Sequence, residues 1–289
     1  MTSDIKTSKI LNKALNDLKS LYREEGFEPG NLIRLAVKPQ WNVLIGSKKQ
    51  CGISMNYTGI HSVYGKLDKQ EYINYIKTLV GKPLFEIAEE TINTDDIHKR
   101  SIGLAALNAL SGPLIIGDRL YEKGYRSDKA IKDFTRPTDV ITIVGYGGMV
   151  KEFLGKSKEL HVTDIRPKEF FETIIVGDKI EHGPRDVILH GAEENEEVLS
   201  RSDVVLITGS TLMNGTFDDL VSYAKNARII SIYGPSAQLL PDSLFDSGVN
   251  VIQSVMIEDT MKLQYDMYNE LDMEIALRMH QYRYTLYKE

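Results

Sequence analysis

The sequence predicts an α/β protein in which a doubly wound, mostly parallel sheet follows a smaller α+β part. From about residue 139 onward, short apolar runs alternate with helix-like segments, which is typical of parallel strands buried on both faces. Before that point, strand-like segments come first and helix-like segments follow. The 289 residues are enough for two domains, which we place at residues 1–125 and 126–289.

The first part begins with an amphipathic helix and continues with strands. Apolar residues of the first helix have helical spacing: Ile5, Ile10, Leu11, Leu15, Leu18 and Leu21. This start is polar and charged, without the apolar core of a signal peptide, so we expect a cytoplasmic protein. The segments "NLIRLAVKP", "WNVLIGS" and "CGISMNYTG" then predict an antiparallel meander of three strands.

Helices follow these strands. The segment "QEYINYIKTLVGKPLFEIAEETI" has helical periodicity interrupted at Gly81 and Pro83, which predicts two short helices. In "NTDDIHKRSIGLAALNALSG", Asn93 or Thr94 is expected to cap a third helix. Gly112 is expected to end that helix.

Composition excludes several classes of protein. The net charge of −6, without a dense Lys/Arg stripe, argues against nucleic acid as the main partner. No run approaches the roughly 18 apolar residues of a membrane span, so no membrane partner is expected. The single cysteine, Cys51, excludes an internal disulfide and a metal cage made only of cysteines within one chain.

The second part alternates strands and helices up to its last segment. Strands are predicted in "VITIVGYGG", "ELHVTDIRP", "DVVLITGS", "ARIISIYGPS" and "VNVIQSVMI". The final residues, 259–289, are expected to form a long helix or a pair of helices packed on the outside. Their Tyr and Met residues are expected to form a packing or homodimer surface rather than a cofactor site.

The stretch "VITIVGYGGMV" is the first candidate for chemistry. A strand that ends in Gly145, Tyr146, Gly147 and Gly148 before a helix can direct backbone amides at an anion. The match to the dinucleotide fingerprint is partial, because Val150 replaces its third small residue. Asp164 closes the next strand, where a ribose-binding carboxylate is expected. A glycine turn needed only for packing remains the alternative.

Two more clusters follow predicted strands. The turn "TGSTLMNGT" combines hydroxyl, amide and glycine residues, a set that suits an anion or a ribose better than a hard metal ion: Thr208, Gly209, Ser210, Thr211, Asn214, Gly215 and Thr216. Thr216 is also a candidate helix cap. The third cluster is Gly234, Pro235 and Ser236, which we expect beside the second.

The sequence contains no recognisable catalytic triad. Ser210 lacks the G-x-S-x-G surround, and none of the six histidines lies four residues from another histidine or a cysteine. His161 and His190 lie near acidic residues, but their spacing matches no metal template. We expect structural roles for the histidines.

The three clusters, with "SIGLAALNALS" and "GPSAQLLPDSLFDSGV", resemble one family along nearly the whole chain. It is the prokaryotic family described as "putative heavy-metal chelation" proteins, with an enolase N-terminal-like domain before a Rossmann-like domain. The resemblance implies a ligand cleft between the domains, to which Asn108 would contribute beside the second and third clusters. An asparagine in an Ala-rich helix can instead bond a neighbouring backbone group. The extra glycines of "VGYGGMV" depart from many members and favour a phosphate or nucleotide.

Two functions follow as hypotheses. The first is a binding protein for an anionic small molecule or metal chelate, with a divalent metal arriving on its ligand. The second is an enzyme that uses S-adenosylmethionine or NAD, with Gly145 and Gly147 near the phosphates or the amino-acid tail and Asp164 at the ribose. A protein with a structural or assembly role is a third hypothesis.

Overall fold

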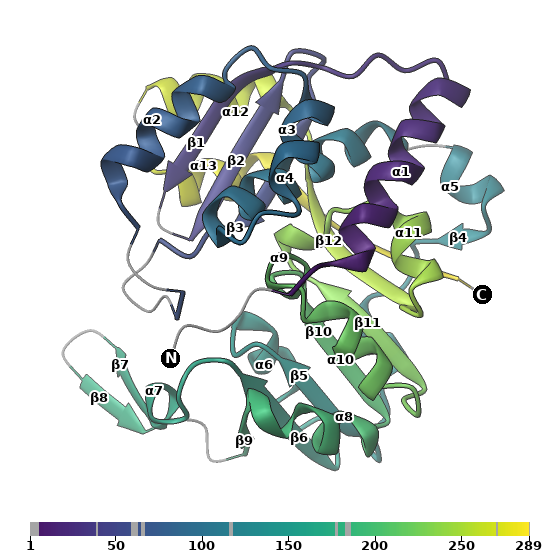
Figure 1. Cartoon of the computed structure of the whole chain (residues 1–289). Helices are drawn as coiled ribbons and strands as arrows, with labels where there is room; N and C mark the ends of the chain where they lie inside the picture. The colour runs from purple at the N-terminus through teal and green to yellow at the C-terminus, as the bar shows by residue number, and fades with distance from the viewer. Residues whose placement is uncertain are drawn as a thin grey trace.

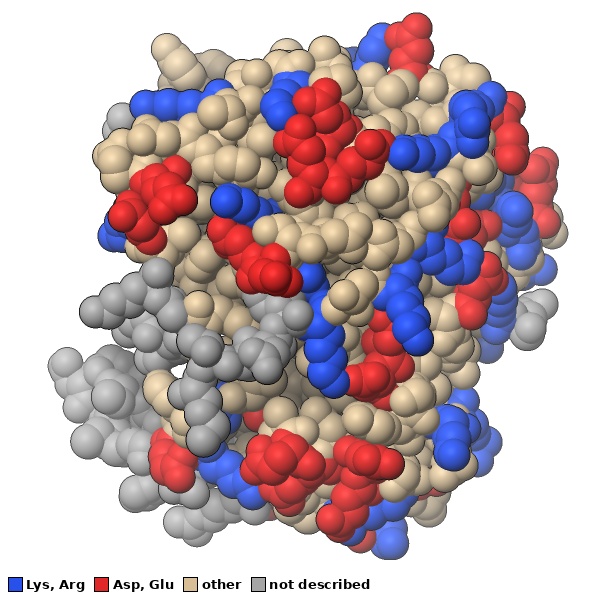
Figure 2. Space-filling model, in the orientation of Figure 1, with Lys and Arg blue, Asp and Glu red and all other residues tan. Residues whose placement is uncertain are grey.

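The computed structural model shows a small three-stranded sheet with helices beside a large eight-stranded sheet (Figure 1). It describes residues 6–38, 40–58, 63–64, 67–115, 118–176, 179–182, 186–269 and 271–288. On the face shown in Figure 2, Lys and Arg are mixed with Asp and Glu, and the described residues form no field of one sign.

The first part of the chain has the predicted order of helix, meander and helices. Its elements are α1 (Lys9–Glu24), β1 (Leu32–Lys38), β2 (Trp41–Gly46), β3 (Cys51–Met55), α2 (Lys69–Leu79), α3 (Leu84–Thr91) and α4 (Ile97–Ser111). The strands pair antiparallel in the order β1-β2-β3. The predicted meander and the break between the two short helices are therefore confirmed.

Helix α4 is the central helix of this part, with 14 of its 15 residues buried. It lies so close to β3 that a Cβ on Gly52 would come within 1.9 Å of the Ala105 carbonyl oxygen. Its N-cap is Asp96, whose carboxylate accepts from the amides of His98 and Lys99. The prediction that Asn93 or Thr94 caps this helix is wrong, because Asp96 lies next to the first turn and its carboxylate can accept from both amides.

The second part contains the large sheet and its helices. In chain order, its first elements are α5 (Asp118–Glu122), β4 (Tyr125–Arg126), β5 (Val140–Val144), α6 (Gly148–Phe153), β6 (Glu159–Asp164), α7 (Glu169–Glu172), β7 (Thr173–Val176), β8 (Lys179–His182), β9 (Ile188–Gly191) and α8 (Asn195–Ser200). The rest are β10 (Val204–Thr208), α9 (Thr211–Asn214), α10 (Phe217–Tyr223), β11 (Ile229–Tyr233), α11 (Pro241–Asp246), β12 (Val251–Ile257), α12 (Thr260–Tyr268), α13 (Met273–His280) and β13 (Gln281–Lys288). Short 3-10 turns include η3 (Ala192–Glu194) and η4 (Pro235–Ala237).

The strand order of the large sheet is β4-β13-β12-β11-β10-β5-β6-β9, and the six strands from β12 to β9 are parallel. Numbered along the chain, these six strands have the order 3-2-1-4-5-6 of a dinucleotide-binding sheet. The predicted α/β fold with a mostly parallel sheet is confirmed. In such a sheet the ligand crevice lies where the order reverses, here outside the ends of β5 and β10.

The end of the chain differs from its prediction. Residues 260–280 form the expected pair of helices, but residues 281–288 form strand β13, which pairs antiparallel with β12 and β4. The segment "QYRYTLYK" is rich in tyrosine and threonine, which favour strands. Pairing with β12 decides the state of this segment, because β12 pairs with β11 on one edge and its other edge accepts β13.

Helices α12 and α13 pack on the small sheet although they follow the large one in sequence. Their buried residues Leu263 and Leu277 form one core cluster with Val43, Ile45 and Ile53. Figure 1 shows these helices on one face of β1–β3 and helices α3 and α4 on the other. The division of the chain at residues 125 and 126 stays a prediction.

Candidate functional site

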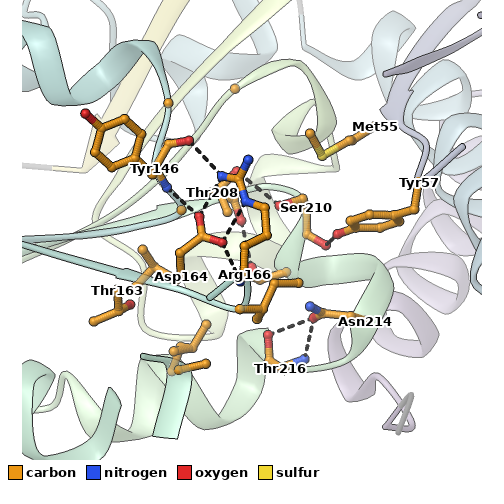
Figure 3. Close-up of a pocket in the computed structure, with 18 of the residues that line it drawn as sticks. Met55, Tyr57, Tyr146, Thr163, Asp164, Arg166, Thr208, Ser210, Asn214 and Thr216 are labelled. Atoms are coloured by element: carbon orange, nitrogen blue, oxygen red, sulfur yellow. Dashed lines mark hydrogen bonds and ion pairs between the residues drawn. The ribbon is translucent and has the colours of Figure 1, made fainter. Parts of the chain in front are cut away.

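A cavity of about 670 Å³ lies at the reversal point of the large sheet (Figure 3). Its floor is formed by the turns after β5, β6, β10 and β11, and its opposite wall by residues 40–41, 55–57 and 63 of the first part. Pockets of roughly 300–1,000 Å³ hold ligands of metabolite size. The sheet topology therefore places a cavity where strand ends from separate parts of the sequence meet.

The glycine turn after β5 forms one side of this cavity. Gly145 has φ +94°, and a Cβ there would lie 2.8 Å from Cγ2 of Thr208, so both the backbone angle and the space require glycine. A Cβ on Gly147 or Gly148 would meet nothing within 4 Å. Within the described part of the chain, the amides of Gly147 and Gly148 have no hydrogen-bond acceptor. These two amides can therefore donate to a ligand.

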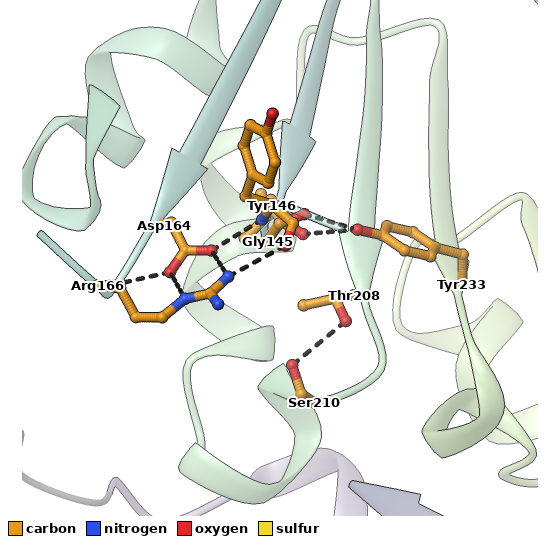
Figure 4. A network of polar contacts seen from close by, with 8 residues as sticks. Gly145, Tyr146, Asp164, Arg166, Thr208, Ser210 and Tyr233 are labelled. Carbon is orange, nitrogen blue, oxygen red and sulfur yellow. Dashed lines mark hydrogen bonds and ion pairs between the residues drawn. The ribbon is translucent and has the colours of Figure 1, made fainter. Parts of the chain in front are cut away.

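Asp164 is held by its own chain rather than free in the cavity (Figure 4). Its Oδ1 accepts from the amide and Nε of Arg166 at 2.8 and 2.9 Å, and its Oδ2 accepts from Nη2 of Arg166 and the amide of Tyr146, both at 2.8 Å. A carboxylate has about four acceptor positions, and all four are used. A ribose could bind Asp164 only after Arg166 moved away.

Arg166 lines the cavity as a cation paired with Asp164. No pattern in the sequence marks it apart from its place two residues after Asp164. The hydrogen bonds to Asp164 raise the pKa of its guanidinium. Nη2 also donates to the Tyr146 carbonyl at 3.0 Å, and the guanidinium lies 4.6 Å from the ring centroid of Phe171, which stacks on Tyr146. Nη1 has no acceptor among the described residues. Arg166 is thus fixed on one side and open on the other.

The turn after β10 is largely bonded to itself. Thr211 donates to the Thr208 carbonyl, and Asn214 Oδ1 accepts from both the amide and the hydroxyl of Thr216. Thr216 stands at the N-cap position of α10 but makes no side-chain cap bond. Ser210 donates to Oγ1 of Thr208 at 3.2 Å, and both residues line the cavity.

A buried arginine holds this turn from behind. Arg100 is 1% exposed, and burial lowers its pKa. Its guanidinium donates to the carbonyls of Thr94, Met213 and Lys6. Gly215, with φ +75°, lies against the Lys6 carbonyl, where a Cβ would come within 2.2 Å. Lys6 is therefore packed directly on the turn after β10.

The turn after β11 joins the two parts of the protein. Asn108 is completely buried, and its Nδ2 donates to the carbonyls of Ile53 and Ser236 at 2.8 and 3.1 Å. Ser236 Oγ accepts from the Met55 amide at 2.8 Å. Gly209 lies against this turn, and a Cβ there would come within 2.6 Å of the Ala237 amide. These contacts cover the free edge of strand β3.

The wall opposite the sheet is mainly apolar and aromatic. It includes Trp41, Met55 and Tyr57, and Figure 3 shows Met55 and Tyr57 on the opposite side of the cavity from Asp164. Burial raises the pKa of Tyr57, and also that of Tyr233 on the sheet side, so both phenols stay neutral. Tyr233 donates to the Gly145 carbonyl at 3.0 Å. No local pattern in the sequence indicates that these aromatic residues meet.

Twelve of the sixteen predicted site residues line the cavity: Gly145, Tyr146, Gly147, Gly148, Asp164, Thr208, Ser210, Thr211, Asn214, Thr216, Gly234 and Pro235. The other four lie behind its wall: Gly209, Gly215, Ser236 and Asn108. The roles proposed for all sixteen residues stay predictions.

A separate polar network lies on β6 and β9. Glu159, His161, His190 and Glu194 are joined in line by contacts of 3.2, 2.9 and 2.8 Å. Each of the three contacts needs one N–H, and two neutral imidazoles supply two, so one contact lacks its proton while both rings are neutral. Burial lowers the pKa of His161, and hydrogen bonds from His190 and then Lys168 lower the pKa of Glu194 to about 2.

The described residues contain no group of three or more His, Cys, Asp or Glu side chains able to hold a metal ion. His61 and the side chain of His182 lie outside the described residues. No helix among the described residues is long and apolar enough to cross a membrane.

The strand order and the cavity define an α/β protein with a cavity at the reversal point of a mostly parallel sheet. Two family models match the chain, DUF4213 over residues 22–111 and DUF364 over residues 133–268, and both are described as "Putative heavy-metal chelation". The chain belongs to this family, as the resemblance predicted.

The chain is similar to one relative in sequence and to two solved structures in fold. An uncharacterized protein from Methanocaldococcus jannaschii is 28% identical over 229 residues, which are 78% of this chain and 77% of the relative. Structures of DUF364-family proteins of unknown function from Pyrococcus horikoshii and Desulfitobacterium hafniense both match with a TM-score of 0.66 and 19% identity. The matches cover 96% and 94% of this chain and 98% and 99% of those chains.

Proposed function

We propose that the cavity binds an anionic, planar small molecule that chelates a metal, and that the metal arrives on this ligand. The family description names heavy-metal chelation and so points to a metal or a metal-binding small molecule as the ligand. The observation that carries the finer proposal is Arg166, whose guanidinium is fixed by Asp164 while Nη1 remains open in the cavity.

The donors and the walls of the cavity support this class of ligand. The amides of Gly147 and Gly148, the hydroxyl of Thr208 and Nη1 of Arg166 are hydrogen-bond donors, which suits a carboxylate or a phosphate. The opposite wall, with Trp41 among its residues, offers aromatic and apolar surface, which suits a planar organic body. An anionic group on the sheet side and a flat body between the two parts would use both surfaces.

A bare divalent cation fits this cavity less well. The two carboxylates that line it are already paired, Asp164 with Arg166 and Asp219 with Lys6. Hard cations prefer several carboxylate oxygens, and binding one here would break both ion pairs. For this reason the proposal places the metal on the small molecule rather than on the protein.

Isothermal titration with pyridine-2,6-dicarboxylate, with Ni²⁺ and with their complex tests the proposal. We expect binding of the dicarboxylate and of its complex, and no binding of Ni²⁺ alone. Arg166→Lys keeps a cation beside Asp164 but loses the planar fork. Hydrogen bonds to charged groups are worth about 1.5–3 kcal/mol, so affinity should fall by roughly 10- to 100-fold.

Arg201→Lys is the matched control, because Arg201 pairs with Glu197 on the surface and does not line the cavity. It should bind both probes like the unaltered protein. Absence of heat with every probe, or equal affinity of the Arg166→Lys variant, would overturn the proposal.

The second hypothesis, an enzyme that uses S-adenosylmethionine or NAD, rests on the glycine turn. The positive φ of Gly145 and the open amides of Gly147 and Gly148 favour a phosphate at this place. The saturated carboxylate of Asp164 opposes the ribose contact. A thermal-shift series with these two cofactors tests the hypothesis. A bound cofactor at about one hundred times its Kd should raise the stability of the folded protein by about 2.7 kcal/mol, and an unchanged melting temperature with both cofactors would rule the hypothesis out.

A further inference from the structure

Helix α12 carries an unpartnered apolar row. Leu263 is buried against the small sheet, whereas Met261, Tyr265 and Tyr268 are 61%, 69% and 76% exposed. The spacing of these three residues, four and then three positions, places them on one side of the helix. That side points away from the sheet, because the opposite side is buried on it.

Helix α13 continues this row beside α12. Ala276 and Leu277 are buried in the same core cluster as Leu263, so both helices lie on the same face of the small sheet. Ile275 and Met279, four residues apart, are 50% and 64% exposed. Both helices therefore present apolar residues on one outer surface.

Strand β13 adds Tyr282, which is 43% exposed, directly after α13. We call the six residues the outer patch: Met261, Tyr265, Tyr268, Ile275, Met279 and Tyr282. Scattered single apolar residues are normal on protein surfaces, but exposed apolar residues gathered on two contacting helices and the strand that follows them favour an interaction site.

The area of the outer patch matches one side of a stable dimer. At about 150–250 Å² per aromatic side chain, the exposed parts of the three tyrosines amount to roughly 300–450 Å². The methionines and the isoleucine add roughly 100–200 Å², since full burial of such a side chain removes about 60–120 Å². A standard interface takes about 800 Å² from each partner, and homodimer interfaces are about 65% apolar, so each partner contributes about 500 Å² of apolar area. The total of roughly 400–650 Å² for the outer patch agrees with this value.

The charges around the outer patch suit a second copy of this chain. Asp259 and Lys262 form an ion pair on α12, and His280 contacts Asp266 at 2.5 Å. Both signs therefore border the apolar rows, so two copies related by a twofold axis avoid repulsion between like charges. We propose that the protein forms a homodimer in which the outer patch of one copy packs on the outer patch of the other.

Sedimentation equilibrium of the full chain from about 1 to 100 μM, a range that includes typical dimer affinities, tests this proposal. We expect a species of twice the 32.7 kDa chain mass. The variant Tyr265→Glu/Met279→Glu places charges in the middle of the interface, and we expect it to sediment as a monomer. At concentrations low enough for the unaltered chain to be monomeric, the two should unfold at the same temperature, because both substituted side chains are exposed.

Tyr121→Glu is the matched control, because Tyr121 on α5 is 71% exposed and lies outside the outer patch. It should remain dimeric. If the double variant fails to fold, Tyr268→Ala replaces it, and we expect a dimer dissociation constant at least tenfold higher. A monomeric unaltered chain, or patch variants that dimerise like Tyr121→Glu, would overturn the proposal.

Discussion

Replacing Asn108 separates a structural role from a ligand-binding role at the junction between the two parts. Asn108 is completely buried and donates two hydrogen bonds, to the Ile53 carbonyl on β3 and to the Ser236 carbonyl on η4. These two acceptors fix the orientation of the amide, because its nitrogen must face both carbonyls. Oδ1 has no partner among the described residues, so truncation loses only the Nδ2 bonds.

The expected cost of Asn108→Ala follows from these contacts. Each lost hydrogen bond is worth about 0.5–1.5 kcal/mol, and two buried carbonyls lose their donor. Removing the unpaired Oδ1 recovers part of this cost, so we expect the free energy of unfolding to fall by about 2–3 kcal/mol. For a chain of this size about 2–4 °C of Tm accompany each kcal/mol, which gives a fall of roughly 5–10 °C.

Thermal and urea unfolding measure this loss, and titration with the dicarboxylate probe measures binding by the same variant. Asn74→Ala, at an exposed position of α2, is the control and should change stability by less than about 0.5 kcal/mol. We expect lower stability with nearly unchanged affinity. A variant of unaltered stability that loses the probe would refute the structural role of Asn108 and support the ligand contact that the family resemblance implies.

Three further predictions concern single residues. In a urea titration, Gly145→Ala should lower the free energy of unfolding by about 1–3 kcal/mol, because φ at this position is +94° and the new Cβ meets Thr208. Gly147→Ala should leave the free energy of unfolding nearly unchanged, because a Cβ at that position meets nothing within 4 Å. The Cys51 thiol, whose pKa burial raises to about 12, should stay unreactive toward a disulfide reagent until denaturant unfolds the chain. Burial lowers the pKa of His161 below its ordinary value. An unperturbed imidazole has a pKa of about 6.5, so below that pH the unfolded chain binds more protons than the folded one, and stability should fall as the pH drops further. His161→Gln should reduce this loss, and an equal pH dependence of both proteins would contradict the assignment.

Local sequence patterns were sufficient to predict most of the elements. The alternation of apolar runs and helices predicted strands β5, β6, β10, β11 and β12, and the interruption at Gly81 and Pro83 predicted two helices. The last strand was missed because its segment follows two helices and its apolar residues pair with β12 and β4. The helix cap at Asp96 was missed because several capping residues stand in a row before α4.

The candidate site was predicted in its turns but not in its contacts. Twelve predicted residues line the cavity because the ends of parallel strands meet at one edge of the sheet. Arg166 was not predicted, since a single arginine in a loop carries no periodic signal. Its bond to Asp164 spans only two residues, but no pattern in the sequence shows that the two side chains turn toward each other. The wall that Trp41 and Tyr57 provide depends on chain segments that lie far from the strand ends in the sequence.

The sequence by itself determined the order of strands and helices and the places where the backbone needs glycine, because spacing and steric limits act over a few residues. Only the tertiary structure decided which turns meet, which carboxylates are already paired and how the chain's end joins the sheet. The physical reason is that strand order and packing between the two parts fix contacts over more than a hundred residues, and the same local pattern is compatible with several such arrangements.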